Sequence, residues 1–161
     1  MMQADISRRS FLRGNIRGNI NVIYPPWAVS DFSNQCERCE DCISVCQEKI
    51  LVKGDGGYPT VNFHSGQCTF CGDCVKACQH AALDGTLPQP WLVIANIKKE
   101  CLSLNAVYCR SCGDSCDQRA VEFQLQTGGR ALPVISQTLC NGCGACVSVC
   151  PNKAIQIKEA A

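Results

Sequence analysis

Two stretches of the chain alternate apolar and polar residues beside a pair of glycines. They read G-D-G-G-Y-P-T-V-N-F over residues 54–63 and T-G-G-R-A-L-P-V-I over residues 127–135. Turn glycines flanked by short alternating runs are typical of β-hairpins, so each stretch predicts a strand, a turn and a second strand. The best apolar run, residues 91–97, includes Asn96 and is far shorter than the roughly 18 residues of a membrane-spanning helix. We therefore expect no transmembrane segment.

The 161-residue chain contains 16 cysteines, which fall in four groups of four. The groups are Cys36, Cys39, Cys42 and Cys46; Cys68, Cys71, Cys74 and Cys78; Cys101, Cys109, Cys112 and Cys116; and Cys140, Cys143, Cys146 and Cys150. In every group the third and fourth cysteines are four residues apart, about one helical turn, so we expect them to begin a short helix with both thiols on a related face. One predicted hairpin separates groups one and two, and the other separates groups three and four. The sequence is thus a duplicated unit of cysteine group, hairpin and cysteine group.

The chain divides near residues 84–91, D-G-T-L-P-Q-P-W, where a glycine and two prolines suit a connector. We predict an N-terminal extension at residues 1–30, a first module at residues 31–87 and a second module at residues 88–161. Aromatic residues make up only 6% of the chain, so a core of large apolar side chains is thin and bound cofactors are expected to hold the fold together. The predicted fold class is a small, cofactor-stabilised α+β protein of cysteine loops, short helices and β-hairpins.

Groups one, two and four have the spacing C-x2-C-x2-C-x3-C, which resembles the cysteine run of bacterial ferredoxins. In that run three closely spaced thiolates surround one [4Fe–4S] cluster, and the fourth cysteine ligates the neighbouring cluster. Applied to this chain, the rule predicts four [4Fe–4S] clusters in tandem ferredoxin-like modules that hold two clusters each. The predicted ligand sets are Cys36, Cys39, Cys42 and Cys78; Cys68, Cys71, Cys74 and Cys46; Cys101, Cys109, Cys112 and Cys150; and Cys140, Cys143, Cys146 and Cys116.

Disulfides and zinc are the alternatives to iron–sulfur clusters. Cysteines separated by two residues are poorly placed to pair with one another as disulfides. Zinc often binds C-x2-C knuckles, but its sites usually take two cysteines from each knuckle rather than the three found here. The third group opens with a gap of seven residues, L-S-L-N-A-V-Y, which must loop outward. A damaged or three-iron site is therefore the alternative for that group.

The charge and the remaining polar residues exclude several classes of function. The 15 Lys and Arg residues against 14 Asp and Glu residues give a formal charge of +1, too weak a field for nucleic acid or an anionic membrane. His64 and His80 lie outside the cysteine spacing, so we interpret them as ordinary solvated or locally hydrogen-bonded residues. The sequence has no Ser-His-Asp set, P-loop lysine or dinucleotide-binding glycine run, so no catalytic residue and no enzyme activity are predicted.

The N-terminal segment S-R-R-S-F-L-R-G, residues 7–14, has the lettering of a twin-arginine export signal. Such a signal needs an apolar stretch of about 7–15 residues after its arginines, followed by a small-residue cleavage site. Residues 13–27 instead read R-G-N-I-R-G-N-I-N-V-I-Y-P-P-W. We therefore expect the protein to stay in the cytoplasm, and a plain basic tail is the alternative reading of the segment.

Three features together resemble the NapF family of ferredoxin-type proteins in the periplasmic nitrate reductase system. They are the S-R-R-S-F-L-R-G segment, the P-P-W element at residues 25–27 and the seven-residue gap in the third cysteine group. The resemblance implies a cytoplasmic iron–sulfur protein that binds the precursor of the molybdenum-containing catalytic subunit and helps it mature before export. It makes Arg8, Arg9 and Trp27 candidate partner-binding residues. Two other functions stay open, an electron-transfer polyferredoxin that links an oxidoreductase to an acceptor, and a scaffold whose clusters only hold the fold.

Overall fold

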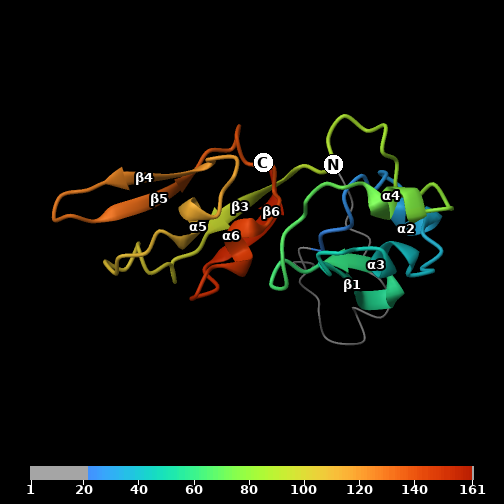
Figure 1. The fold of residues 1–161 in the computed structure, drawn as a ribbon, viewed down its shortest axis with the longest axis horizontal. Coiled ribbons are helices and arrows are strands. Elements are labelled where there is room, and N and C mark those ends of the chain that lie inside the picture. Colours follow the sequence, from blue (N-terminus) through green and yellow to red (C-terminus); the bar gives the residue numbers. More distant parts are fainter. Residues whose placement is uncertain (1–21, 161) are drawn as a thin grey trace, which may run out of the picture.

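The structure is a computed structural model, and it describes residues 22–160. Arg8 and Arg9 lie outside these residues. The elements are α2 (Phe32–Gln35), α3 (Asp41–Ser44), β1 (Leu51–Lys53), the 3-10 helix η1 (Asp55–Gly57), β2 (Pro59–Val61), α4 (Asp73–Ala77), β3 (Val93–Ile97), α5 (Ser111–Asp114), β4 (Val121–Leu125), β5 (Ala131–Ile135), α6 (Ala145–Ser148) and β6 (Ile155–Glu159). Figure 1 shows an elongated molecule, with β3 to β6 toward one end of the long axis and α2 to α4 toward the other. Among residues 22–160, no helix is long and apolar enough to cross a membrane.

Both predicted hairpins are confirmed. Strands β1 and β2 pair antiparallel, with Leu51 opposite Val61, and the glycine-rich η1 turn joins them. Strands β4 and β5 pair antiparallel, with Val121 opposite Ile135. Gly128, in the turn of the second hairpin, has a φ of 82°, a left-handed conformation that glycine adopts without the Cβ clash of other residues.

In the second half, the first strand and the last strand pair with each other. Strand β3 follows the connector and pairs antiparallel with the C-terminal strand β6, with Ile97 opposite Ile155. The first half has a shorter counterpart, because Ala28 forms an isolated antiparallel bridge with Leu83. Residues 22–30 of the predicted extension therefore lie against the first module.

The short helices fall where the cysteine spacing predicts them. Each of α3, α4, α5 and α6 is about one turn long and contains the third cysteine of its group. The fourth cysteine lies past the end of the helix and lines a different cavity, so the expectation that both thiols share a helical face was wrong. The chain then makes the same turn after every group, because the third residue past the fourth cysteine has a left-handed backbone. These residues are Lys49, Ala81, Arg119 and Lys153, with φ of 53°, 54°, 51° and 49°. Only the fourth group has a proline after its last cysteine, so the turn does not depend on it.

The buried residues form two clusters, and one of them spans both modules. The smaller cluster belongs to the first module and includes Phe32, Leu51 and Leu83. The larger cluster joins Ile50 and Phe63 of the first module to residues of β3, α5, α6 and β6. The predicted boundary between modules is therefore crossed by a continuous core.

Candidate metal centres

All sixteen cysteines lie within the described residues as free thiols, and they surround four cavities. We name each cavity by the cysteines that line it. The first cavity is lined by Cys36, Cys39, Cys42 and Cys78; the second by Cys46, Cys68, Cys71 and Cys74; the third by Cys101, Cys109, Cys112 and Cys150; and the fourth by Cys116, Cys140, Cys143 and Cys146. Each cavity thus takes three cysteines from one group and the last cysteine of the paired group. The structure brings together the four sets that the ferredoxin rule predicts, while ligation itself stays a prediction.

In three groups the backbone turns sharply on both sides of the second cysteine. The residues before it are Arg38, Phe70 and Gly142, with φ of 58°, 55° and 71°. The residues after it are Glu40, Gly72 and Gly144, with φ of 69°, 78° and 83°. Consecutive left-handed turns wrap the chain around one point, so the first three cysteines of each group can line the same cavity.

The third group reaches the same arrangement by a different route. Its residue after the second cysteine, Arg110, has a φ of −130°, so the tight double turn is missing. The inserted loop is held instead by Ser103, whose hydroxyl donates to the carbonyl of Ala131 at 2.6 Å, and by Asn105. The Asn105 side-chain amide donates to the carbonyls of Lys99 and Cys101 at 2.8 Å each. These bonds fix the loop so that Cys101 and Cys109 lie on the same cavity despite the gap.

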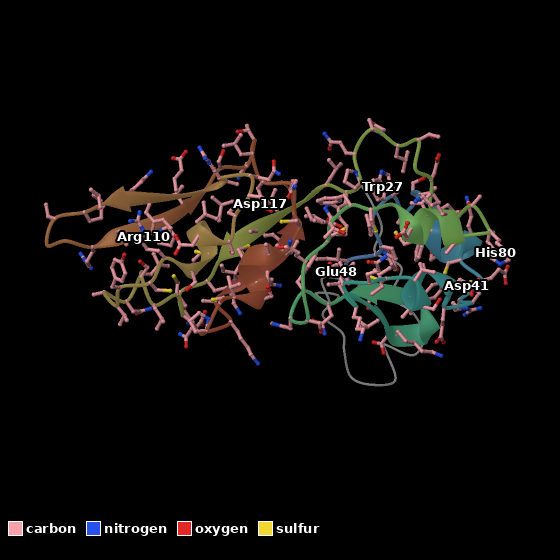
Figure 2. The ribbon with its side chains drawn as sticks, viewed as in Figure 1. Trp27, Asp41, Glu48, His80, Arg110 and Asp117 are labelled. Atoms are coloured by element: carbon pink, nitrogen blue, oxygen red, sulfur yellow. The ribbon has the colours of Figure 1, made fainter. Side chains whose placement is uncertain are left out.

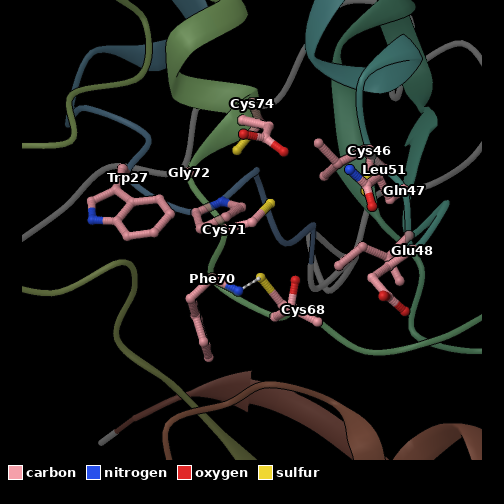
Figure 3. Close-up of a pocket in the computed structure, with 14 residues that line it drawn as sticks. Trp27, Cys46, Gln47, Glu48, Leu51, Cys68, Phe70, Cys71, Gly72 and Cys74 are labelled. Carbon is pink, nitrogen blue, oxygen red and sulfur yellow. Dashed lines mark hydrogen bonds between the residues drawn. The ribbon is translucent and has the colours of Figure 1, made fainter.

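Aromatic residues lie beside the second cavity (Figure 3). The backbone N–H of Phe70 donates to the Cys68 sulfur at 3.4 Å, and the half-buried Trp27 ring packs edge-on against Phe70 with centroids 6.4 Å apart. The backbone N–H of Trp27 donates to the Pro90 carbonyl at 2.5 Å. Trp27, a candidate partner-binding residue, therefore has internal contacts at this cavity and on the connector.

Backbone N–H groups also donate to sulfur in the second module. Ala120 donates to Cys116 at 3.3 Å, and Ala154 donates to Cys150 at 3.3 Å. Both donors lie four residues after the cysteine, directly past the left-handed turn that follows each group. Hydrogen bonds to sulfur stabilise thiolate ligands and tune the potential of an iron–sulfur cluster. The four cysteine sulfurs that line each cavity form a donor set that suits a [4Fe–4S] cluster.

Comparisons with known proteins agree with this donor set. Residues 35–83 match the 4Fe-4S dicluster domain family, and residues 133–156 match the 4Fe-4S binding domain family. The chain is 44% identical to a ferredoxin-type protein NapF of Haemophilus influenzae, over 99% of this chain and 97% of the relative. It is 41% identical to the NapF of Escherichia coli K12, over 96% of this chain and 95% of the relative. The chain belongs to the NapF family of ferredoxin-type proteins.

As a NapF-family member, the protein binds [4Fe–4S] clusters, and the predicted fold class of tandem ferredoxin-like modules is confirmed. The matched ranges contain the first, second and fourth cysteine groups, and neither range contains the third group. A further relative is a subunit of the ion-translocating oxidoreductase complex of Methanosarcina acetivorans. It is 35% identical over 76% of this chain and 47% of the relative.

The electrostatics of the NapF-family cavities couple cluster binding to proton release. Burial, followed by the nearby thiolates of Cys36 and Cys74, raises the pKa of Cys42 to about 12. Burial, followed by the thiolates of Cys143 and Cys140, raises the pKa of Cys146 to about 12. Buried cysteines whose thiolates would repel one another stay protonated as thiols until positive charge offsets the repulsion. Iron supplies that charge, so the cysteines lose their protons as a cluster is inserted.

The structure also brings to the first cavity one residue, His80, whose position in the sequence did not mark it as part of a metal site. His80 lies on this cavity, two residues after Cys78, although its exposed ring was interpreted as an ordinary solvated histidine. Arg38 lines the same cavity and places its guanidinium over the Tyr58 ring, 5.2 Å from the centroid. The signal available in the sequence for His80 was its proximity to a predicted ligand, because it lies two residues after Cys78. His64 does not line any of the four cavities.

Proposed function

We propose that this protein is a cytoplasmic iron–sulfur accessory protein that binds the precursor of the periplasmic nitrate reductase catalytic subunit and supports its maturation before export. The observation that carries the proposal is the set of four cysteine-lined cavities in a chain similar along nearly its whole length to NapF proteins. In this role the protein supplies electrons or an assembled cluster to its partner and catalyses no reaction of its own.

The proposed ligands are the four cysteines of each cavity, which gives four clusters and uses all sixteen thiols. A [4Fe–4S] cluster supplies one-electron chemistry at a potential set by hydrogen bonds to its sulfurs and by exposure. The third cysteine of every group is buried, whereas Cys39 and Cys71 are exposed. The clusters of the first and second cavities would thus be anchored inside the fold and reachable from outside on one side.

The first cavity is the proposed point of contact with an electron partner. It is lined by Glu37, Arg38, Glu40 and His80, all four exposed or half-exposed at the surface. Glu40 forms an ion pair with Lys53. A ring of charges around a cofactor orients an incoming protein through long-range attraction, which is sensitive to salt.

The recognition role of the twin-arginine-like segment is tested by pull-down of the nitrate reductase precursor. We expect wild-type protein to retain the precursor and the Arg8→Ala/Arg9→Ala variant to retain much less. The Arg13→Ala/Arg17→Ala variant is the matched control, because it removes the same charge from the same segment. Equal binding by all three proteins would remove the paired arginines from the proposal, and no binding by any of them would refute precursor recognition.

The number and kind of metal centres are tested by anaerobic purification with metal and sulfide analysis. Four [4Fe–4S] clusters correspond to about sixteen irons and sixteen sulfides per chain. About twelve irons would indicate that the third group holds no intact cluster, and zinc in place of iron would overturn the proposal.

A second candidate function is an electron-transfer polyferredoxin that links an oxidoreductase to an acceptor. The similarity to the ion-translocating oxidoreductase subunit favours it, since that match covers 76% of this chain. The two functions are separated in cells that lack the protein. If nitrate reductase matures normally in those cells while electron flux to it falls, the polyferredoxin function is correct and the maturation role is wrong.

A further inference from the structure

The two modules meet at two predicted ligands that belong to different cavities. The backbone N–H of Cys68, on the second cavity, donates to the carbonyl of Cys143, on the fourth cavity, at 2.8 Å. Burial, together with nearby thiolates that include the one of Cys143, raises the pKa of Cys68 to about 11. The second and fourth cavities are therefore neighbours across the module boundary.

The contact between these cysteines is held in place by packed aromatic rings. The Phe63 ring lies against Gly144, the residue after Cys143, so closely that a Cβ added at Gly144 would be 2.0 Å from the ring. Trp91 packs edge-on against Phe63 and Phe70, with ring centroids 5.8 Å and 5.7 Å away. Its indole N–H donates to the carbonyl of Asn141 at 2.9 Å. These packing contacts and this hydrogen bond thus hold the loops of the second and fourth cysteine groups against each other.

Within each module the paired cavities are also neighbours. Cys42 of the first cavity and Cys74 of the second belong to one buried cluster. Cys112 of the third cavity and Cys146 of the fourth belong to the other buried cluster. Together with the contact at Cys68, these pairs connect all four cavities.

Labelled residues beside the cavities follow the same order in space. Along the long axis, Figure 2 shows Arg110 near one end, then Asp117, then Glu48, and His80 at the opposite end. Arg110 adjoins Cys109 of the third cavity, and Asp117 adjoins Cys116 of the fourth. Glu48 lines the second cavity, and His80 lines the first.

We propose that the Cys68–Cys143 contact joins the two ferredoxin-like modules into one row of four metal centres, in the spatial order first, second, fourth, third. This inference rests on the proposed occupancy of the four cavities. The order differs from the order of the cysteine groups along the chain, and it makes the first and third cavities the two ends. A donor and an acceptor can then engage opposite ends of the molecule without competing for one surface.

The row is tested by removing the cluster at one end. In the Cys39→Ser variant the first cluster is lost, and iron is expected to fall from about sixteen to about twelve per chain. The second cluster then has a neighbour only across the module contact. Each reduced [4Fe–4S] cluster carries an unpaired spin, and spins on adjacent clusters broaden and split one another's EPR signals. After dithionite reduction we expect this variant to show coupled spins only.

If the clusters instead formed two separate pairs, with no coupling between the modules, the EPR spectrum would differ. The second cluster would then appear in the Cys39→Ser variant as an isolated signal of about one spin per chain, and this result would overturn the row. The Cys109→Ser variant repeats the test from the other end, where the fourth cluster is the one that must stay coupled. The Cys109→Ser variant also tests the row of four centres if the Cys39→Ser protein does not fold.

A substitution at the module contact supplies the matched control. Adding Gly144→Ala to Cys39→Ser should weaken the coupling, because the new Cβ meets the Phe63 ring. Adding Gly128→Ala instead, in the turn between β4 and β5, should leave it unchanged, because that Cβ meets nothing within 4 Å at a φ of 82° and Gly128 lines none of the four cavities. Equal coupling in both would overturn the role of the contact. About twelve irons in the wild-type protein would overturn the row of four but not the proposed function. Zinc in place of iron, or irons that dithionite does not reduce, would overturn the proposed function and the row with it.

Discussion

Gly144 and Gly72 form a natural pair for measuring how strongly the two modules pack together. They occupy equivalent places after the second cysteine of their groups, with φ of 83° and 78°. Alanine in a left-handed conformation costs about 1–2 kcal/mol at either site. The two sites differ in the space around the new Cβ, which meets nothing within 4 Å at Gly72. At Gly144 it would lie 2.0 Å, 2.4 Å and 2.6 Å from three carbons of the Phe63 ring. Phe63 is 5% exposed, so its ring has little room to move away.

Overpacking of this kind adds roughly 1–3 kcal/mol to the cost of the substitution. Gly144→Ala is therefore expected to destabilise the protein by about 2–5 kcal/mol, against about 1–2 kcal/mol for Gly72→Ala. If unfolding relieves the clash, the difference makes Gly144→Ala unfold roughly 5- to 150-fold faster than Gly72→Ala. The assay is anaerobic unfolding in guanidinium chloride, followed by the loss of the visible absorbance of the clusters.

A double variant tests the assigned cause. Phe63→Leu makes room beside residue 144, so the Gly144→Ala/Phe63→Leu protein should unfold more slowly than Gly144→Ala alone, although Phe63→Leu by itself is destabilising. Equal unfolding rates for Gly144→Ala and Gly72→Ala would refute the steric argument. Failure of Phe63→Leu to slow unfolding in the double variant would show that the ring is not the obstacle.

Three further predictions concern the third group and the clusters. Ser103→Ala removes the donor to the Ala131 carbonyl, so the free energy of unfolding should fall by about 1 kcal/mol, as measured by thermal unfolding. Metal analysis should show partial loss of iron from the third cavity. Arg110→Ala removes a guanidinium 4.7 Å from the Phe123 ring centroid, so the thermal midpoint should fall by the equivalent of roughly 0.5–1 kcal/mol, and Arg110→Lys should recover part of it. Removing iron with a chelator should abolish both hairpins in far-UV circular dichroism, and a native spectrum without iron would show that the clusters do not hold the fold.

Much of the fold was predictable because the cysteine spacing and the turn glycines act locally. A gap of four residues is about one helical turn, so the short helices at Cys42 and Cys74 followed from the spacing, although the fourth cysteine of each group lies past the end of its helix. The hairpin at residues 121–135 likewise followed from its glycines and alternating run. The ferredoxin rule for the fourth cysteine grouped the residues that the structure brings to each cavity.

Other features depend on residues far apart in the chain and left no local signal. The sequence predicted an outward loop in the third group, but the bond from Ser103 to Ala131 that fixes it crosses 28 residues. Trp27 stood out in the P-P-W element, yet its contacts with Phe70 and Pro90 appear only in the folded chain. His80 came to the first cavity although its spacing matched no ligand pattern.

The sequence by itself thus determined the chemistry of this protein, namely four sets of cysteines, the modules that carry them and the kind of cluster they suit. Four thiolates must lie close together to ligate a small inorganic cube, and the short, regular spacing of the cysteines along the chain meets that requirement. The tertiary structure alone decided how the sets lie relative to one another. The bond from Cys68 to Cys143 and the Phe63 ring against Gly144 join segments more than seventy residues apart, and only packing between modules can specify such neighbours.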